Sequence, residues 1–248
     1  MNALRQLADE CAAAWGLALE PPLESEASLV IPAGDAVLKL NADWHFEAEF
    51  EADALALWGG HGAVRLLARD DERHALLIER CRPGTRLWDA GDDEIEVVSP
   101  LLTRLELEPT EPHPFRMVAD EADRWLEELP QRYPPSRLLD AALEVFRTVD
   151  RDAKHLVNQD LHGGNVLRAE RESWLVIDPK PLVGERELDG VGLLRNADDP
   201  ARWLHALVEL GYDRERSWGW GFAHALAWDN AQDAARIYAA RERSSRRR

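Results

Sequence analysis

Asp160, Asn165 and Asp178 are three oxygen-bearing side chains that lie close together in the second half of the sequence. The first two have the D-x-x-x-x-N spacing of a phosphotransferase catalytic loop, within Asn158-Gln-Asp-Leu-His-Gly-Gly-Asn165. Two short apolar runs follow Asn165 and can pair as a hairpin, which would return Asp178 to the end from which Asn165 leaves. Hard oxygen ligands, together with substrate phosphates, are what Mg²⁺ prefers. The spacing predicts a catalytic base, Asp160, beside a metal-holding pair, Asn165 and Asp178.

His162 gives the same segment a second interpretation. A metal-dependent hydrolase would use Asp160, His162 and Asp178, but no HExxH or comparable ligand spacing supports it. Asp and Asn are also common in turns, so each residue alone would indicate only a loop. The joint spacing and the intervening hairpin favour the phosphotransferase, and we expect His162 to pack within its loop.

The first third of the chain has the pattern of strands around one helix. Turn residues separate two apolar runs at Pro32-Ala-Gly-Asp35 and two more at Asp70-Asp-Glu-Arg73, so each pair predicts a hairpin. Between the hairpins, apolar residues recur at helical spacing until Gly59-Gly60. The expected strands are 29–31, 36–40, 63–68 and 75–78, and the expected helix is 45–58.

After Pro83-Gly84 nearly every pattern is helical. We expect one helix to stop at Pro130, a second to follow it, and one short β-like island at 166–177 before a helical C-terminus. A β-rich lobe (1–82), a Pro-Gly junction and a helical lobe (83–248) predict an α+β protein with a bilobal, protein-kinase-like fold.

Length and composition set wider limits. The 248 residues include 30 basic and 47 acidic side chains, a net charge of −17, and 45% are hydrophobic, which excludes collagen, coiled coil and general disorder. The acidic balance argues against nucleic acid or an anionic membrane as the main partner, and no obligate protein partner is indicated. Two cysteines without a CxxC pair suggest neither a disulfide framework nor structural zinc. The chain lacks a membrane-length apolar run and a basic-then-apolar start, so we expect it to be cytoplasmic.

The chain resembles the aminoglycoside phosphotransferase superfamily. Its sequence is most similar to the streptomycin kinase / hydroxyurea phosphotransferase branch in three segments: Glu51–Leu67, Leu76–Gly84 and Val176-Ile-Asp-Pro-Lys-Pro-Leu-Val-Gly-Glu185. The resemblance runs from about Ala36 to about Arg195. It implies a bilobal kinase that moves the γ-phosphate of ATP (GTP is not excluded) to a small-molecule hydroxyl with the help of Mg²⁺.

Matching the family's motifs implies the same catalytic residues as the spacing does. Asp160 would be the catalytic base, and Asn165 and Asp178 the Mg²⁺ ligands. One departure matters, because the superfamily loop often reads His-Gly-Asp where this chain has Asn158-Gln159-Asp160. Asn158 can still hydrogen-bond to hold the loop, so we expect activity.

The resemblance also implies that a lysine and a glutamate in the first lobe bind the nucleotide phosphates. Lys39 lies at the end of an apolar strand, where the superfamily places its phosphate-binding lysine, although alone it would read as a surface lysine. A glutamate on the next helix should pair with it. Glu47, Glu49 and Glu51 all compete on spacing, and the family pattern selects Glu51.

Adenine would lie between the lobes. Glu79 and Cys81 fall where kinases offer backbone groups to the base, and the Cys81 sulfur itself is expected to be an inert buried thiol. No GxxxxGK[ST] or GxGxxG motif is present, which excludes a P-loop NTPase. The region 22–30 would cover the nucleotide instead.

The acceptor is the open part of the prediction. Streptomycin, another aminoglycoside, hydroxyurea and an ordinary metabolite all fit, and the net charge suggests a cationic molecule bound in the second lobe. Trp218, Trp220 and Trp228 should form helix core or, alternatively, a pocket wall. Negative charge beside them could come from Asp189 first, or from Asp198, Asp199 and Asp229.

The sequence thus predicts an ATP- and Mg²⁺-dependent small-molecule phosphotransferase, with antibiotic inactivation as the implied role. The alternative is a non-catalytic, kinase-like binding protein for nucleotide or small molecules. Loss of any of the three catalytic-loop and metal-loop residues would have favoured that alternative, and all three are present. A protein kinase ranks third, because HRD, DFG and APE are absent.

Overall fold

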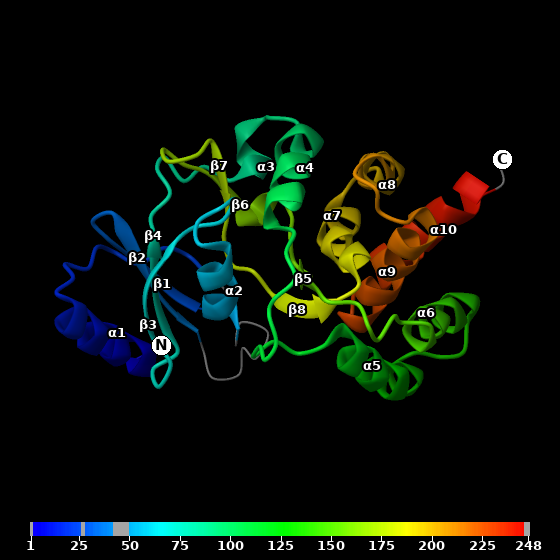
Figure 1. Cartoon of the computed structure of the whole chain (residues 1–248), viewed down its shortest axis with the longest axis horizontal. Coiled ribbons are helices and arrows are strands. Elements are labelled where there is room, and N and C mark those ends of the chain that lie inside the picture. The colour runs from blue at the N-terminus through cyan, green and yellow to red at the C-terminus, as the bar shows by residue number, and fades with distance from the viewer. Residues whose placement is uncertain (1, 26–27, 42–49, 246–248) are drawn as a thin grey trace.

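The computed structural model describes residues 2–25, 28–41 and 50–245. It has a β-rich N-terminal lobe and a helical C-terminal lobe (Figure 1). The α+β, kinase-like architecture predicted from the order of elements is therefore confirmed. The division at residues 82 and 83 stays a prediction.

The N-lobe is built on one antiparallel sheet with the strand order β1-β2-β4-β3. Its strands are β1 (Ser28–Ala33), β2 (Ala36–Asn41), β3 (Leu66–Asp70) and β4 (Ala75–Glu79). Both predicted hairpins form. The predicted strand at 63–68 is wrong in its first half, because the backbone N–H of Val64 donates to the carbonyl of Val176 in the other lobe, at 3.0 Å.

Two helices cover opposite faces of this sheet (Figure 1). The α1 helix (Asn2–Trp15), which the sequence patterns did not lead us to expect, packs on the face that carries Leu38 and Leu40. The α2 helix (Glu51–Trp58) packs on the face that carries Val37. Strand alternation explains the division, since neighbouring residues of a strand point to opposite faces.

The predicted helix end at Gly59 is confirmed. Gly59 adopts a left-handed conformation, with φ of 57°, and its N–H donates to the Leu55 carbonyl at 3.0 Å. A residue without a Cβ adopts this conformation at little cost, so glycine ends the helix. The earlier part of the predicted helix, 45–49, lies outside the described residues.

The C-lobe is mainly helical. It contains α3 (Leu87–Ala90), α4 (Glu94–Leu105), α5 (Val118–Arg132), α6 (Arg137–Arg147), α7 (Val191–Asn196), α8 (Pro200–Glu209), α9 (Arg214–Ala227) and α10 (Ala231–Ser245). The expectation that Pro130 ends α5 is wrong by two residues. Near a helix end proline removes one hydrogen bond, and the Tyr133 N–H still donates to the Leu129 carbonyl.

Two small sheets carry the segment between α6 and α7. The predicted hairpin is confirmed as β6 (Val166–Arg168) paired with β7 (Trp174–Val176). A second pair was not expected: β5 (His155–Asn158) pairs antiparallel with β8 (Pro181–Gly184). The β5–β8 pair therefore encloses the whole loop-and-hairpin segment between its strands.

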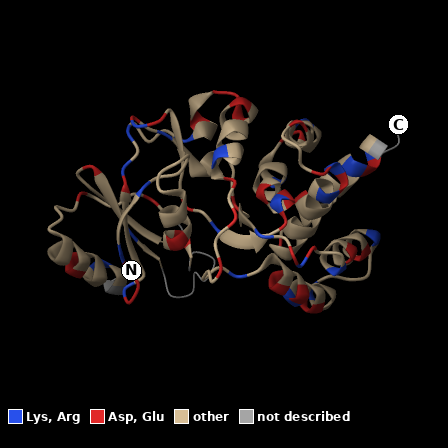
Figure 2. Cartoon of the chain, in the orientation of Figure 1, with Lys and Arg blue, Asp and Glu red and all other residues tan. Residues whose placement is uncertain are grey.

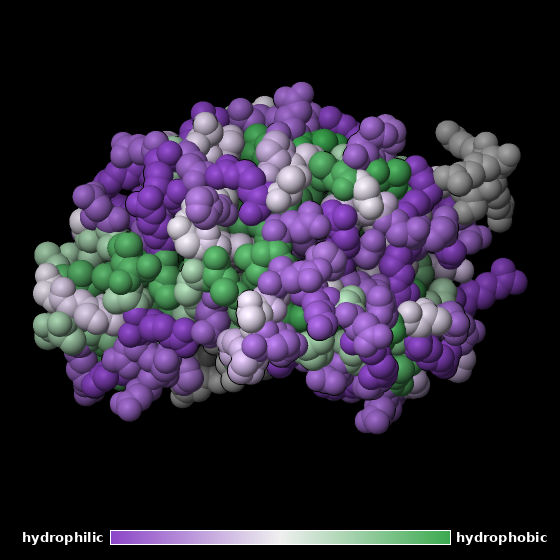
Figure 3. Space-filling view, viewed as in Figure 1, coloured by the Kyte–Doolittle hydropathy of each residue, from purple (hydrophilic) through white to green (hydrophobic). Residues whose placement is uncertain are grey.

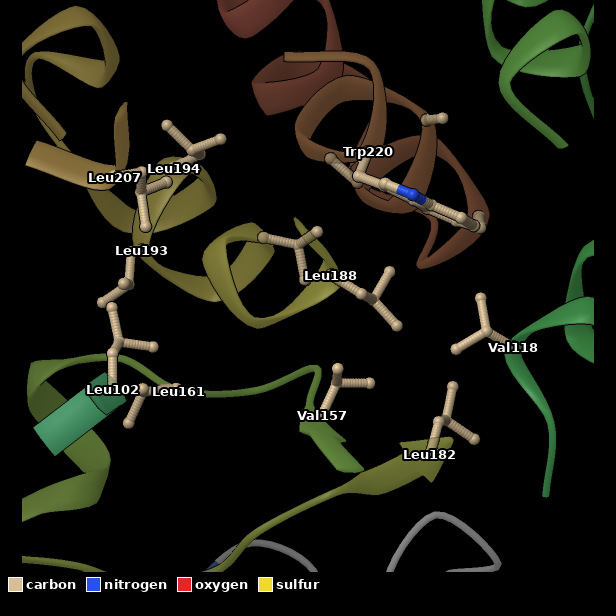
Figure 4. Close-up of a cluster of buried hydrophobic side chains, with 14 of the residues drawn as sticks. Leu102, Val118, Val157, Leu161, Leu182, Leu188, Leu193, Leu194, Leu207 and Trp220 are labelled. Carbon is tan, nitrogen blue, oxygen red and sulfur yellow. The ribbon is translucent and has the colours of Figure 1, made fainter. Parts of the chain in front are cut away.

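The core of the C-lobe lies directly under these sheets (Figure 4). Val157 and Leu182 extend from β5 and β8 towards Leu188 and Trp220, and all four are fully buried. Leu161, in the loop after β5, is also fully buried and lies beside Leu102. Trp218 is buried as well, so helix-core packing is the role of both of these tryptophans.

Charge is spread over the whole fold. Acidic and basic segments alternate along both lobes, with a marked acidic stretch on α5 (Figure 2). The surface in the same view is mostly hydrophilic, and its largest apolar area lies over the N-lobe (Figure 3). Within the described residues, no helix combines the length and the apolar character that crossing a membrane requires.

Gly192 sets the distance between α7 and the catalytic loop. A Cβ at this position would come closer to the Leu161 backbone than real Cβ atoms approach. We predict that Gly192→Ala destabilises the protein by about 1–3 kcal/mol, since overpacking against backbone cannot relax through a side chain. Gly190→Ala is the control, because its Cβ would meet only the end of the Leu207 side chain. Equal losses for the two variants in denaturant unfolding would contradict this account.

Candidate active site

A cavity of about 1150 Å³ lies between the sheet of the N-lobe and the small sheets of the C-lobe. All seven residues that the sequence singled out for catalysis, nucleotide or metal line it: Lys39, Glu51, Glu79, Cys81, Asp160, Asn165 and Asp178. Leu23, Glu24, Ser25 and Ser28 line it as well, as expected for a covering segment at 22–30, of which residues 26 and 27 lie outside the described residues.

Lys39 and Glu51 form a buried ion pair. The Lys39 ammonium lies 2.6 Å from Glu51 Oε2, and the glutamate is fully buried. Asn41 Nδ2 also donates to Glu51 Oε2 at 3.3 Å, which helps to orient the carboxylate. The competing residues Glu47 and Glu49 lie outside the described residues.

Asp178 lies where the lobes meet. Its Oδ1 accepts from Lys39 at 2.6 Å and from Lys180 at 2.8 Å, and its backbone has a positive φ of 51°. Burial alone would raise the pKa of Asp178, but the two ammonium groups hold it well below its ordinary value. Burial would likewise lower the pKa of Lys39, and Glu51 and Asp178 together raise it instead. Both groups are therefore charged across the physiological pH range.

Asp160 is fixed by its own loop and by α7. Asn165 Nδ2 donates to the Asp160 carbonyl at 3.0 Å, and Arg195 Nη2 donates to Asp160 Oδ1 at 2.5 Å. The Ile177 N–H donates to the Asn165 carbonyl, so the hairpin does return Asp178 to Asn165. Sequence reasoning missed Arg195, because nothing in its local pattern marks a contact across 35 residues.

Asn158 holds the catalytic loop to the Asp178 loop. Its Oδ1 accepts from the N–H of Asp160 at 3.1 Å and from the N–H of Lys180 at 3.0 Å. Its own N–H donates to Asp189 Oδ1 at 2.6 Å. The asparagine found in place of the superfamily's histidine therefore does bond the loop, as its amide oxygen allowed us to expect.

His162 packs against an aromatic neighbour. Its ring stacks on Trp88 with centroids 4.7 Å apart, and its Nδ1 accepts from the Gly164 N–H. Burial lowers the pKa of His162, so the ring is neutral at neutral pH. Glu94 connects Trp88 to the same loop, because its carboxylate accepts from the Gly163 N–H at 2.7 Å and from Trp88 Nε1 at 3.2 Å.

The side chains of Glu79 and Cys81 do not offer nucleotide contacts. The Glu79 carboxylate is taken up by Arg171, at 2.8 Å, and by the N–H of Arg65. Burial raises the pKa of Cys81 to about 12, so its thiol is inert. Its backbone N–H has no hydrogen-bond acceptor within the described residues, which leaves it available to a ligand.

None of the acidic residues suggested for the acceptor lines the cavity. Asp189 bonds the catalytic loop, Asp199 caps α8 by accepting from the Ala201 N–H, and Asp229 bonds Arg132. Trp228 does line the cavity, and the Arg195 guanidinium lies 4.6 Å from its ring centroid. The cationic character of the acceptor stays a prediction, and these carboxylates do not support it.

The donor set suits Mg²⁺. No described residue donates a hydrogen bond to Asn165 Oδ1 or to Asp178 Oδ2, and both residues line the cavity. Three or more His, Cys, Asp or Glu side chains do not gather around any one point in the described part of the chain. Two protein oxygens completed by phosphate oxygens and water are the usual surroundings of this ion.

Comparison with known proteins identifies the family. Residues 21–207 match the family model described as "Aminoglycoside/hydroxyurea antibiotic resistance kinase". The chain is 35% identical to streptomycin 6-kinase from Streptomyces glaucescens, with 95% of this chain and 86% of that protein covered. It is 33% identical to hydroxyurea phosphotransferase from Kitasatospora aureofaciens, with 83% and 66% covered.

The chain belongs to the aminoglycoside/hydroxyurea antibiotic resistance kinase family. It is therefore a small-molecule kinase, and the resemblance to this branch noted from the sequence is confirmed. A solved structure, the GDP complex of aminoglycoside 2'-phosphotransferase-IIIa, superposes with a TM-score of 0.67 at 13% identity, covering 96% of this chain and 97% of that one. At that identity the likeness confirms the kinase-like fold alone.

Asp189 should make the stability of the kinase depend on pH. Burial raises the pKa of Asp189 to about 7, above its value of about 4 in an unfolded chain. Because the folded state favours the protonated carboxyl, Asp189 contributes to the free energy of unfolding fully below about pH 4. This contribution is lost as the pH rises to about 7, where the folded protein must bury a carboxylate charge. We expect Asp189→Asn to reduce the fall in unfolding free energy between pH 5 and pH 8 by about 2–3 kcal/mol. Identical pH dependence in both proteins would contradict this.

Proposed function

We propose that the kinase transfers the γ-phosphate of ATP to a hydroxyl of a small molecule with the help of Mg²⁺. The observation that carries the proposal is the convergence of Lys39, Asp160, Asn165 and Asp178 on one cavity between the lobes. GTP remains an alternative donor, since the fold neighbours include a GDP complex as well as a streptomycin–ATP ternary complex.

In this proposal the nucleotide binds under the sheet of the N-lobe. Adenine meets the backbone at Glu79 and Cys81, where a free N–H supports the assignment. The phosphates reach Lys39, whose ammonium Glu51 holds at 2.6 Å. Asn165 and Asp178 would hold Mg²⁺, which when bound neutralises phosphate charge and orients the phosphoryl group.

The chemistry assigned to the chain is the orientation and deprotonation of the acceptor. The acceptor oxygen forms a bond to the γ-phosphorus as the bond from that phosphorus to the ADP oxygen breaks. Asp160 takes the hydroxyl proton. Arg195 donates to its Oδ1 at 2.5 Å, whereas Oδ2 has only a long contact of 3.5 Å from Asn165 Nδ2, so Oδ2 is the oxygen assigned to face the acceptor. Fixing this geometry before the reaction is what the enzyme contributes in phosphoryl transfer.

The acceptor belongs to the class on which the relatives act. Their names cover streptomycin and hydroxyurea, and antibiotic inactivation is the corresponding role. We expect ADP release, in the presence of Mg·ATP, with at least one member of a panel of streptomycin, other aminoglycosides, hydroxyurea and sugars. Nucleotide binding without ADP release for any acceptor would favour the alternative of a non-catalytic binding protein.

Asp160 and Asp178 should fail in different ways when each is changed to Asn. Asp160→Asn keeps the shape and removes the base, so turnover should fall roughly 10²–10⁴-fold with Mg·ATP affinity retained. Asp178→Asn should weaken Mg·ATP binding itself. Calorimetric affinity and turnover are measured for both variants, with and without Mg²⁺. Retained turnover in Asp160→Asn, or equal loss of nucleotide binding in both, would refute the assigned roles.

Lys39→Ala tests whether this lysine binds the nucleotide phosphates. Loss of one preorganised charge contact typically costs about 3–4 kcal/mol of transition-state stabilisation, so kcat/KM should fall roughly 10²–10³-fold while the fold is retained. Lys154→Ala is the matched control, since Lys154 is exposed and does not line the cavity. Steady-state kinetics at wild-type level for Lys39→Ala would remove this lysine from the site.

A further inference from the structure

Lys180 is a buried cation for which neither the sequence motifs nor the proposed mechanism provides a role. Its side chain is 5% exposed, and it lines the cavity beside Asp178. Of the 30 basic residues in the sequence only Lys39, Lys154 and Lys180 are lysines. The other basic residues are arginines, and two of the three lysines contact the same carboxylate, that of Asp178.

The two lysines differ in their counter-charges. Lys39 has two carboxylates, Glu51 and Asp178, each at 2.6 Å. Lys180 has one, Asp178 at 2.8 Å, and its Nζ has no other acceptor in the described residues. Both ammonium groups bond Oδ1 of Asp178, so Oδ2 is the oxygen left for a metal ion, and a divalent cation bound there would offset the single negative charge that the two lysines share. Once Asp178 acts as a metal ligand, Lys39 keeps the negative charge of Glu51, whereas the charge of the one carboxylate beside Lys180 is offset by the metal ion.

A buried ammonium group whose counter-charge is offset is costly, so Lys180 needs a further anion as a replacement. Its backbone limits where that replacement can lie. The Lys180 N–H donates to Asn158 Oδ1, and its carbonyl accepts from the Gln159 N–H at 3.2 Å. Lys180 is therefore tied between the metal-ligand Asp178 and the loop that carries Asp160. In the proposed mechanism, the transferred phosphoryl group passes between those two carboxylates.

We propose that Lys180 binds the γ-phosphoryl group as a second phosphate lysine, gaining it as a counter-charge when the Mg²⁺ of the Mg·nucleotide offsets the charge of Asp178. This rests on the proposed function and adds a residue to it. Lys39 then serves the phosphates that stay on the nucleotide and Lys180 the one that leaves. Lys180 forms and breaks no covalent bond; its charge offsets that of the phosphoryl oxygens during transfer.

The proposal separates ATP-like from ADP-like ligands. Calorimetry with Mg²⁺ and the non-hydrolysable analogue AMP-PNP should give roughly 10- to 100-fold weaker binding to Lys180→Met than to wild type, the size of one charge-assisted contact. Binding of Mg·ADP should change less than about threefold. Lys154→Met is the matched control and should change neither. Equal weakening of both nucleotides, or of neither, would overturn the assignment.

Two further measurements keep the test independent of folding and of the acceptor. In wild-type protein labelled with ¹⁵N only at lysine, the Lys180 side-chain signal should shift further with Mg·AMP-PNP than with Mg·ADP, because only the former brings a γ-phosphate, and equal shifts with the two nucleotides would count against the proposal. Lys180→Arg keeps the charge and should recover part of the AMP-PNP preference; no recovery in a folded variant counts against it. If wild type binds neither nucleotide, the proposed function itself fails, whereas normal binding with an unchanged preference in Lys180→Met refutes only the role of Lys180.

Discussion

The ion pair between Lys39 and Asp178 is the interaction on which the active site depends. It connects β2 of the N-lobe to the segment after β7 in the C-lobe, at 2.6 Å. Lys39 is almost fully buried, and a buried charge is costly unless it is paired, so Asp178 of the C-lobe supplies part of the counter-charge that the N-lobe lysine needs. The consequence is a cavity whose most basic point is already neutralised before a ligand arrives. A nucleotide phosphate that binds Lys39 must therefore compete with the carboxylate that already neutralises this lysine.

The rest of the C-lobe keeps Asp178 in place. The β6–β7 hairpin returns the chain to Asn165, and the β5–β8 pair holds the two ends of the segment together. Asn158 bridges the same two stretches through a single amide oxygen. Beneath them the core packs Leu161 and Val157 against the helices (Figure 4). Catalytic geometry here is thus a property of backbone hydrogen bonds supported by apolar packing, and the positive φ of Asp178 is held by that framework.

Features that depend on neighbouring residues could be predicted from the sequence, whereas features that depend on contacts between distant segments could not. The hairpins, the C-cap at Gly59 and the 166–177 island depend on local turn chemistry and periodicity, and they were found. The β5–β8 pair and the α1 helix were missed, because packing between segments distant in the sequence decides them. The end of α5 was placed two residues too early, because a proline near a helix end removes one hydrogen bond without ending the helix. The candidate site shows the same division. Asp160, Asn165 and Asp178 belong to one motif, whereas Arg195 and Glu94 reach the loop from elsewhere, by 35 and 69 residues along the chain.

The scarcity of lysine has a practical consequence for studying this kinase. Amine-reactive reagents need an exposed amino group, and Lys39 and Lys180 are 5% and 4% exposed. Lys154 is the exposed lysine, just before β5 and outside the cavity lining. Among the lysine side chains, coupling to a sensor surface or a dye would then use Lys154, which lies outside the cavity lining.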